Sequence, residues 1–465
     1  MELKNIYFVG AGGIGMANLV RYYLANKFNV AGYDRTPSDL TRALSEEGAQ
    51  IVYDDIADLI PVEFRNPKDT LVVYTPAIPN DNNILVYFRA NGFEIIKRAA
   101  LLGKIPLHSK GICIAGSHGK TTTSSMVAHL LHSSPIGCNA FLGGILRNYD
   151  SNLLLSATSP YSVIEADEYD RSFHHLSPHI AVVTSTDPDH LDIYGNEENY
   201  LESFAHFTSL INPGGFLLMH TGMKLIPRVN DGVEIFSYSS SEEGDYHASN
   251  IRHESGHLFF DFVAPDTTIT DIELGVPIDI NIDNAVAAIA IAHRLGVDND
   301  TIRQAMLSFL GAKRRFEIWL RQEGENGKVL IDDYAHSPNE VKASIASVKA
   351  LYPNRKLSVI FQPHLYTRTR DFAPEFAEAL STADEVILCE IYPARELPIP
   401  GVTSEIIFRN VTASEKILLR KEELMDYLDR TVTEEGRDLV VTMGAGDIDR
   451  LINPVKELLT DRKKC

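Results

Sequence analysis

The sequence predicts an α/β protein of three domains: a Rossmann-like N-terminal domain, a P-loop central domain and a Rossmann-like C-terminal domain. Strand and helix patterns alternate through residues 5–103 and again through residues 329–447, which is typical of parallel sheets covered by helices. Between them, residues 112–123 show a β-branched run, a glycine turn and a Gly-Lys-Thr helix start, the pattern of a phosphate-binding loop. The length of 465 residues also fits three domains at roughly 150 residues each.

Breaks in this pattern mark two linkers. Pro106 and Gly111 interrupt the first one, and the second runs through residues 309–317. We therefore expect domains at residues 1–104, 105–311 and 312–465.

In the N-terminal domain, a strand at residues 6–9 leads into a glycine turn and then into a helix that extends to about residue 26. The turn matches G-x-G-x-x-G, and a second strand at residues 29–33 ends at Asp34. Two interpretations are open: a dinucleotide with Asp34 on its ribose, or another phosphate ligand with Asp34 as an ordinary turn residue. The candidate phosphate-binding glycines are Gly10, Gly12, Gly13 and Gly15.

The central glycine turn predicts a nucleotide triphosphate site. Free N–H groups at a helix start bind anions, Lys120 is placed to reach the β- and γ-phosphates, and the Thr121 hydroxyl is placed to reach Mg²⁺. Ile114 stands where the general pattern has its first glycine, so the loop is a shortened variant. The candidate ATP-binding residues of this loop are Gly116, Ser117, His118, Gly119, Lys120, Thr121 and Thr122.

Two further strands of the central domain end in acidic residues. One runs over residues 161–164 and ends at Glu165, and the next ends before residues 187–192, which include His190. The carboxyl ends of strands in open α/β sheets face the ligand, and Mg²⁺ prefers hard oxygen ligands beside phosphate. Glu165 is therefore the first choice for a metal ligand, and His190 is a less usual second.

The later part of the central domain predicts a small antiparallel sheet and a helix. The short apolar runs at residues 257–263 and 272–280 alternate in part, as strands do. Residues 281–296 show a helical pattern with Asn281 or Asp283 as N-cap.

The C-terminal domain carries polar clusters after two strands. Residues 332–338 include His336, and residues 362–370 include His364 and Arg368. Arginine suits capture of a carboxylate, and histidine moves protons near neutral pH. The adjacent arginines of the second linker are either solvated or placed to reach a γ-phosphate.

Composition excludes several classes of protein. The formal net charge of −20 argues against nucleic-acid binding, which needs a basic surface. The four cysteines are scattered, which argues against disulfides and structural zinc. No signal peptide or apolar run near 18 residues is present, so we expect a cytoplasmic protein that binds no membrane.

Taken together, these motifs resemble the Mur ligase family over essentially the whole chain. Further markers of the resemblance are Glu165-Ala166-Asp167-Glu168, Lys313-Arg314-Arg315-Phe316, Asp333-Tyr334-Ala335-His336, Gln362-Pro363-His364 and Pro398-Ile399-Pro400-Gly401. Within the family the chain is most similar to the alanine-adding branch. This implies an ATP-dependent ligase that joins L-alanine to the lactyl carboxylate of UDP-N-acetylmuramate through an acyl phosphate. It also implies a UDP-sugar, and not NAD, at the N-terminal glycines.

The resemblance implies roles for single residues. Lys120 would contact the terminal phosphates, and Thr121, Glu165 and His190 would hold two Mg²⁺ ions. The residues near the adenine, ribose and γ-phosphate of ATP would be Asn281, Asp333 and Arg315. The residues around L-alanine would be Tyr334, His336, His364 and Arg368, with Arg368 on the carboxylate. Either His336 or His364 could accept the amine proton.

The chain departs from the family pattern at Ile280 and Leu365, where many members have histidine and arginine. Residues 189–213 contain no lysine, which predicts that the carbamylated lysine of most other Mur ligases is absent.

Three rival functions stay open at this stage. A recycling ligase of the same fold would join a tripeptide to UDP-N-acetylmuramate. An NAD-dependent oxidoreductase would use the N-terminal glycines, and a regulatory module would bind nucleotide without catalysis. We expect a monomer or a weak homodimer.

Overall fold

The computed structural model describes residues 3–460 except 106–108, 189–190, 242, 255, 323, 325–326, 395 and 432–436. The chain divides into two units. The first comprises Met1–Ser249, Phe262–Thr270 and Asp283–Met306, and the second Asn250–Asp261, Asp271–Ile282 and Leu307–Cys465. No helix in the described ranges is long and apolar enough to cross a bilayer. The domain boundaries expected from the sequence stay predictions.

The N-terminal sheet is parallel, with strand order β3-β2-β1-β4-β5. Its strands are β1 (Asn5–Val9), β2 (Asn29–Tyr33), β3 (Gln50–Val52), β4 (Thr70–Tyr74) and β5 (Glu94–Lys97). Its helices are α1 (Ile14–Ala25), α2 (Asp39–Glu46), α3 (Asn83–Ala90) and α4 (Arg98–Leu102). Every residue of β1 is buried, as expected for the central strand of a sheet covered on both faces. The predicted Rossmann-like arrangement is confirmed.

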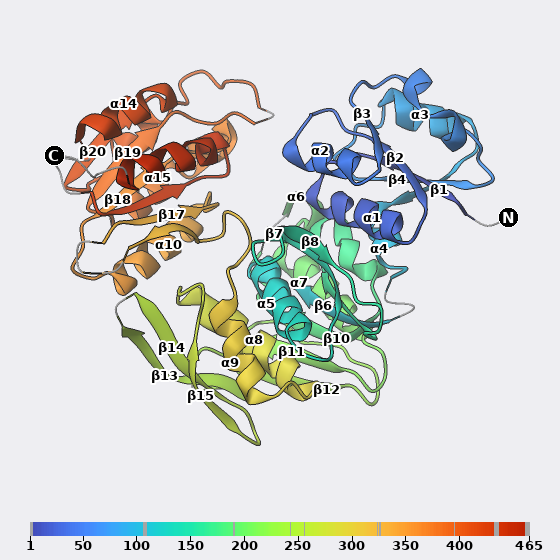
Figure 1. Ribbon diagram of the computed structural model, residues 1–465, viewed down its shortest axis with the longest axis horizontal. Helices are drawn as coiled ribbons and strands as arrows, with labels where there is room; N and C mark the ends of the chain where they lie inside the picture. Colours follow the sequence, from blue (N-terminus) through green and yellow to red (C-terminus); the bar gives the residue numbers. More distant parts are fainter. Residues whose placement is uncertain are drawn as a thin grey trace. The chain divides into compact units, whose positions relative to one another are not determined.

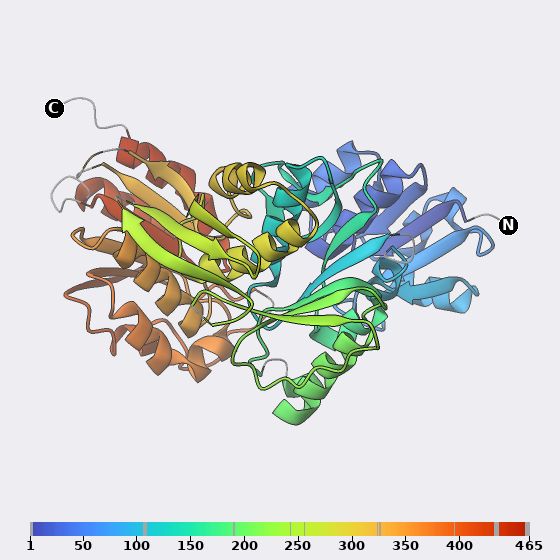
Figure 2. The ribbon, with the colours of Figure 1, turned by 90° about the horizontal axis from the view of Figure 1, so that it is seen from below.

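In the described residues of the central part, ten strands form a sheet of order β15-β14-β13-β12-β11-β10-β6-β9-β7-β8. The strands are β6 (Lys110–Ala115), β7 (Asn139–Leu146), β8 (Ser151–Leu154), β9 (Tyr161–Glu165), β10 (Pro178–Val183), β11 (Phe216–His220), β12 (Glu234–Ser239), β13 (Tyr246–Glu254), β14 (His257–Val263) and β15 (Thr268–Glu273). The helices are α5 (Lys120–His132), α6 (Leu191–Tyr194), α7 (Glu197–Ser209), α8 (Ile280–Arg294) and α9 (Asn299–Ser308). Figure 2 shows α5 and α7 on opposite faces of the sheet.

Three expectations for the later central segment are wrong. The strands do not make the expected small antiparallel sheet but belong to the ten-stranded one, because β11 and β12 pair in parallel with the main sheet and continue it outward. The strand expected at residues 272–280 ends at Glu273, and α8 begins at Ile280. Asn281 and Asp283 therefore lie inside the first turn of α8 and are not N-caps.

Within the first unit, the N-terminal layer packs on the central sheet through α1, which lies beside β7 and β8 (Figure 1). The buried Asn152 side chain donates to the Ile14 carbonyl at 2.7 Å and accepts from Arg21 Nη1 at 2.8 Å. Arg21 also binds the Glu47 carboxylate at 2.7–3.0 Å. These polar contacts fix α1 against β8.

The C-terminal sheet has the order β16-β17-β21-β18-β19-β20 and is parallel except for β16. Its strands are β16 (Glu317–Arg321), β17 (Val329–Asp333), β18 (Leu357–Phe361), β19 (Glu385–Cys389), β20 (Glu415–Leu419) and β21 (Leu439–Met443). The helices are α10 (Pro338–Leu351), α11 (Tyr366–Asp371), α12 (Ala373–Leu380), α13 (Glu405–Phe408), α14 (Lys421–Thr431) and α15 (Ile452–Thr460). Figure 1 shows α14 and α15 on the opposite face of this sheet from α10.

Candidate active site

The central glycine turn joins β6 to α5, as the sequence predicted. Gly116 and Gly119 have φ of 147° and 81°, values that favour glycine. A Cβ on Gly116 would overlap Thr184 Oγ1, and one on Gly119 would lie 2.7 Å from Asn284 Oδ1. The backbone can therefore follow this path only with glycine at both positions. Lys120, Thr121 and Thr122 form the first turn of α5.

Neighbouring loops brace the turn from outside. Ser117 Oγ donates to the Asp187 carbonyl at 2.6 Å and lies 2.8 Å from the Tyr200 hydroxyl. The His118 N–H donates to Ser185 Oγ at 2.8 Å. The turn is thus held in place by the segment after β10 and by α7.

The side chain of Lys120 folds over the turn. Its ammonium donates to the Gly116 carbonyl at 2.5 Å and lies 3.0 and 2.9 Å from the two carboxylate oxygens of Glu168. Glu168 is 1% exposed. Burial raises the pKa of the Glu168 carboxyl, and the Lys120 charge opposes that rise. This ion pair links the loop to the segment after β9, and the sequence analysis did not single out Glu168 for it.

Glu165 lies at the end of β9 beside the same turn. Its carboxylate accepts from the Gly143 N–H at 3.1 Å. Burial raises the pKa of the Glu165 carboxyl, while the Lys120 charge and a hydrogen bond from Thr121 oppose the rise. The structure therefore brings together Lys120, Thr121 and Glu165, three of the predicted site residues. His190, the remaining predicted metal ligand, lies outside the described residues.

Asn284 is a further residue of this region that sequence reasoning missed. It is buried on α8, and its Oδ1 accepts from Thr123 Oγ1 at 2.9 Å while lying against Gly119. Asn284 follows Asn281 by about one helical turn, so the two residues share a face of α8. The sequence could have indicated this only if the start of α8 at Ile280 had been known.

The predicted adenine contact, Asn281, lies in the second unit. Its side chain is 3% exposed and donates to the Val276 carbonyl at 3.2 Å. Its contact with adenine stays a prediction.

In the N-terminal glycine turn, Asp34 supports the turn itself. Asp34 Oδ2 accepts from the Gly12 N–H at 2.7 Å, and Oδ1 accepts from the Thr36 N–H at 3.1 Å. A Cβ on Gly12 would lie 2.8 Å from Asp34 Oδ2. Of the two interpretations of Asp34, this geometry favours the turn residue.

The start of α1 lies beside a charged residue of α4. A Cβ on Gly15 would lie 2.7 Å from Arg98 Nη1, and Arg98 Nη2 donates to Asp167 Oδ2 at 3.2 Å. Arg98 thus connects the N-terminal glycine turn to the acidic segment after β9, all within the first unit.

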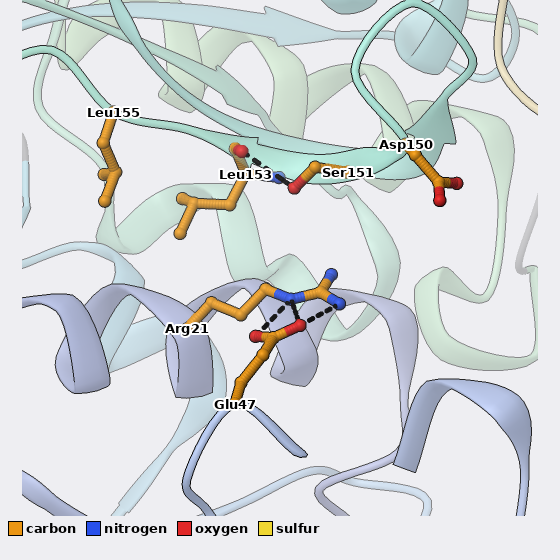
Figure 3. Close-up of a pocket in the computed structure, with 6 residues that line it drawn as sticks. All are labelled: Arg21, Glu47, Asp150, Ser151, Leu153 and Leu155. Carbon is orange, nitrogen blue, oxygen red and sulfur yellow. Dashed lines mark hydrogen bonds and ion pairs between the residues drawn. The ribbon is translucent and has the colours of Figure 1, made fainter. Parts of the chain in front are cut away.

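A hollow of about 400 Å³ lies between α1, the end of α2 and β8, lined by Arg21, Glu47, Asp150, Ser151, Leu153 and Leu155 (Figure 3). The Arg21 guanidinium is already bound by Glu47 and Asn152. This hollow contains none of the predicted site residues, so we do not assign it to the reaction.

The C-terminal unit gathers the predicted amino-acid residues after β17 and β18. The rings of Tyr334 and His336 are 5.2 Å apart, and those of His336 and His364 are 6.2 Å apart. Arg368 is close enough to lower the pKa of His336 through its charge. Its Nη1 is buried and has no hydrogen-bond partner among the described residues. The structure therefore places Tyr334, His336, His364 and Arg368 close together.

The hydrogen bonds of His336 fix its tautomer. Nδ1 lies 3.0 Å from the Tyr334 carbonyl and 3.1 Å from Glu340 Oε2, both of which are acceptors. The neutral imidazole therefore carries its proton on Nδ1, and Nε2 keeps a lone pair. Burial is the main cause that lowers the pKa of His336, so the neutral form is favoured.

The two linker arginines have different roles. Arg314 donates to the carbonyls of Gly444 and Gly446 at 2.6 and 3.1 Å and to Asp332 Oδ2 at 3.2 Å. Arg315 is exposed, with its guanidinium 5.4 Å from the centre of the Tyr334 ring. Arg314 thus binds groups of the C-terminal unit, whereas Arg315 is exposed beside Tyr334.

Asp333, the predicted ribose contact, lies at the end of β17. Its Oδ1 accepts from the Phe316 N–H at 3.4 Å, and burial raises the pKa of its carboxyl. Its neighbour Asp332 is fully buried against Thr442, and burial raises the pKa of Asp332 to about 6.

Three family models match the chain in succession. Residues 5–110 match the Mur ligase family catalytic domain, residues 114–292 the Mur ligase middle domain, and residues 314–446 the Mur ligase glutamate ligase domain.

Known relatives match over almost the full length. The chain is 58% identical to a UDP-N-acetylmuramate–L-alanine ligase of Parabacteroides distasonis over 459 residues, which are 98% of each chain. It is 55% identical to the ligase of the same name from Phocaeicola vulgatus, over 99% of each chain. A crystal structure of the UDP-N-acetylmuramate-alanine ligase of Thermotoga maritima aligns with a TM-score of 0.82 at 27% identity, covering 99% of this chain and 100% of that one. The chain therefore belongs to the Mur ligase family.

Proposed function

We infer that the protein is an ATP-dependent ligase that joins L-alanine to UDP-N-acetylmuramate and releases ADP and phosphate. The observation that carries this inference is the match over 98% of the chain, at 58% identity, to a relative that bears the name of this activity. The phosphate-binding loop supports it, because an oxidoreductase would have no use for Lys120, Thr121 and Glu165 at one turn. The tripeptide-joining ligase is the less supported alternative.

ATP makes the chemistry possible, because a free carboxylate is a poor electrophile. Transfer of the γ-phosphoryl group to the lactyl carboxylate forms an acyl phosphate and releases ADP. The neutral amine of L-alanine then attacks the carbonyl carbon, and the resulting tetrahedral intermediate expels phosphate. The new amide is the product.

Lys120 is our candidate for stabilising the terminal phosphates of ATP. Its ammonium already lies over the mouth of the turn, bonded to the Gly116 carbonyl at 2.5 Å. A cation held there stabilises charge that develops on the transferring oxygens.

The residues beside the turn fit magnesium. Thr121 and the Glu165 carboxylate supply hard oxygen atoms next to the phosphate-binding loop, and the two are joined by a hydrogen bond. We propose that they hold Mg²⁺, with His190 as a ligand of a second ion. When bound, Mg²⁺ would offset the charge of the phosphate oxygens.

In the C-terminal unit, we propose that Arg368 binds the carboxylate of L-alanine. The support is its buried Nη1, which no described residue satisfies. We further propose that Tyr334, His336 and His364 surround the amino acid, Arg315 reaches the γ-phosphate, Asp333 the ribose and Asn281 the adenine. His336 is our choice as proton acceptor because its Nε2 keeps a lone pair in the neutral form.

For the N-terminal domain, we propose that Gly10, Gly12, Gly13 and Gly15 hold the diphosphate of the UDP-sugar. The first turn of α1 has no side-chain cap and no acidic residue, and the Arg98 guanidinium lies beside Gly15, which favours an anion at this helix start.

Phosphate release measured with ATP, UDP-N-acetylmuramate and one amino compound at a time tests the function. We expect release with L-alanine, weaker release with L-serine and glycine, and none with a tripeptide that begins with L-alanine. Faster release with the tripeptide would favour the recycling ligase. NADH oxidation without ATP cleavage would contradict a ligase altogether.

A further inference from the structure

The ammonium of Lys120 in the phosphate-binding loop is bound by groups of the protein itself. An ammonium has three protons to donate. One goes to the Gly116 carbonyl at 2.5 Å, one to Glu168 Oε1 at 3.0 Å and one to the Ser117 carbonyl at 3.4 Å. The second carboxylate oxygen of Glu168 lies 2.9 Å from the ammonium and completes the ion pair. A phosphate oxygen can therefore bind the ammonium only by replacing one of these partners.

Glu168 is held in place by its surroundings. Its side chain is 2% exposed, whereas that of Lys120 is 15% exposed. Its carbonyl accepts from the Tyr194 hydroxyl at 2.5 Å and from the Arg171 N–H at 3.0 Å. These two hydrogen bonds anchor the backbone of Glu168 beside the loop.

Of the partners of Lys120, Glu168 is the one that an incoming phosphate would displace. The Gly116 carbonyl belongs to the loop that cradles the nucleotide, and it carries only a partial charge. Glu168 carries a full negative charge, so it competes with phosphate for Lys120 and also repels it. Its carboxylate thus opposes the binding of a nucleotide with phosphates at this position.

We propose that Glu168 is a positioning residue for Lys120: it holds the ammonium over the loop and yields it to the terminal phosphates of the nucleotide. The inference rests on the proposed role of Lys120 in ATP binding. The ion pair keeps the Lys120 ammonium in position for the phosphates. Because the ion pair must break when the nucleotide binds, it also lowers nucleotide affinity, so that ADP leaves after each turnover.

Calorimetric titration of the full-length enzyme with MgADP tests the proposal. We expect Glu168→Gln to bind MgADP more tightly by roughly tenfold, the worth of one charge-assisted hydrogen bond that no longer has to be broken. AMP has no β-phosphate to reach Lys120, so its affinity should not change. In turnover assays, inhibition by ADP should strengthen by the same factor as binding.

Asp167→Asn is the matched control. It removes one negative charge from the neighbouring position, but Asp167 binds Arg98 at 3.2 Å and not Lys120. We expect a much smaller change in MgADP affinity from it. In a Lys120→Met background, Glu168→Gln should no longer tighten MgADP binding, because the ion pair is already absent.

The outcomes separate the two levels of inference. Weaker or unchanged MgADP binding by Glu168→Gln, or equal tightening of AMP, would overturn the role of Glu168. Absence of MgADP binding by the unaltered enzyme would instead overturn the proposed nucleotide site. If Glu168→Gln does not fold, Glu168→Asp decides: its shorter side chain withdraws from the ammonium, and we expect tighter MgADP binding by a smaller factor.

Discussion

Several side chains in the candidate site owe their ionisation to the groups packed against them. Burial raises the pKa of Glu165 and lowers that of His336, because a buried site disfavours the charged form of either group. Lys120 limits the shift of Glu165, and Glu340 limits that of His336, since each supplies the opposite charge. The pKa of a buried site residue therefore depends on its burial and on the charge of its partner.

His336 should titrate below its ordinary pKa of 6.5. The Glu340 carboxylate favours the imidazolium, so Glu340→Gln should lower the pKa of His336 further. Histidine NMR titration measures this, with the signal assigned through His336→Asn. A higher pKa in Glu340→Gln would contradict the proposed pairing, in which Arg368 and Arg315 are the opposing positive charges.

Lys120→Ala should reduce phosphate release by roughly 10²–10³-fold, because the variant loses the cation that stabilises the transferring phosphoryl group. Its circular dichroism spectrum should match that of the unaltered protein. Lys224→Ala serves as control, since Lys224 is an exposed partner of Glu197 in the same unit and should leave the rate unchanged. Equal rates in both variants would argue against the proposed phosphate contact.

At the scale of helices and strands, backbone shape decides which side chains meet. β7 runs so close to the end of β9 that a Cβ on Gly143 would overlap both carboxylate oxygens of Glu165. Arg314, in the linker before β16, binds two carbonyls of the turn after β21. Neither contact is visible in the local pattern of either element.

Gly143→Ala should displace the Glu165 carboxylate from its position beside Thr121. We expect the Mg²⁺ concentration for half-maximal phosphate release to rise by roughly tenfold, as when a metal ligand loses its orientation. High Mg²⁺ should restore most of the rate. An unchanged Mg²⁺ requirement would contradict the assignment of Glu165 as a metal ligand.

Arg314 and Arg315 allow a comparison of adjacent arginines. Arg314→Ala removes hydrogen bonds from a largely buried guanidinium, and we expect the unfolding free energy of the C-terminal unit to fall by about 2–4 kcal/mol. Arg315→Ala should change it by less than about 0.5 kcal/mol, because that side chain is exposed. Urea denaturation followed by Trp319 fluorescence measures both. Phosphate release should nevertheless fall in Arg315→Ala.

At the scale of the whole molecule, the two units have separate hydrophobic cores. One core of the first unit includes Phe8, Phe173 and Phe204, and one core of the second includes Ile360 and Leu424. Each core could support an unfolding transition of its own.

UDP should stabilise the first unit selectively, because the N-terminal glycine turn lies there. At a hundredfold excess over its dissociation constant, a ligand contributes about 2.7 kcal/mol to the unit that binds it. Trp319 is the single tryptophan of the chain and lies on β16 in the second unit. We expect UDP to raise a calorimetric transition while the Trp319 fluorescence midpoint stays in place. Equal shifts of both would show that the units unfold together.

Much of this protein was predictable from the sequence alone. The family, the three α/β parts, the phosphate-binding loop and the cluster after β17 and β18 rest on local patterns: glycines that need positive φ, apolar periodicity, and polar residues directly after buried strands. Strands such as β2 and β14 have the bounds that the pattern predicted, since short apolar runs between turns define their own ends. The comparisons confirm the predicted activity, and the roles of single site residues stay predictions.

Only the tertiary structure decided how the residues pair. Several contacts join segments that are distant in the sequence. Glu168 binds Lys120, Asp34 accepts from the glycine turn, and Arg314 donates to the turn after β21. In the same way, β11 and β12 pair with strands of the central sheet and extend it. Local sequence determines what a side chain is able to do. Its partner is set by burial and by the packing of elements far apart in the chain, which no local pattern records.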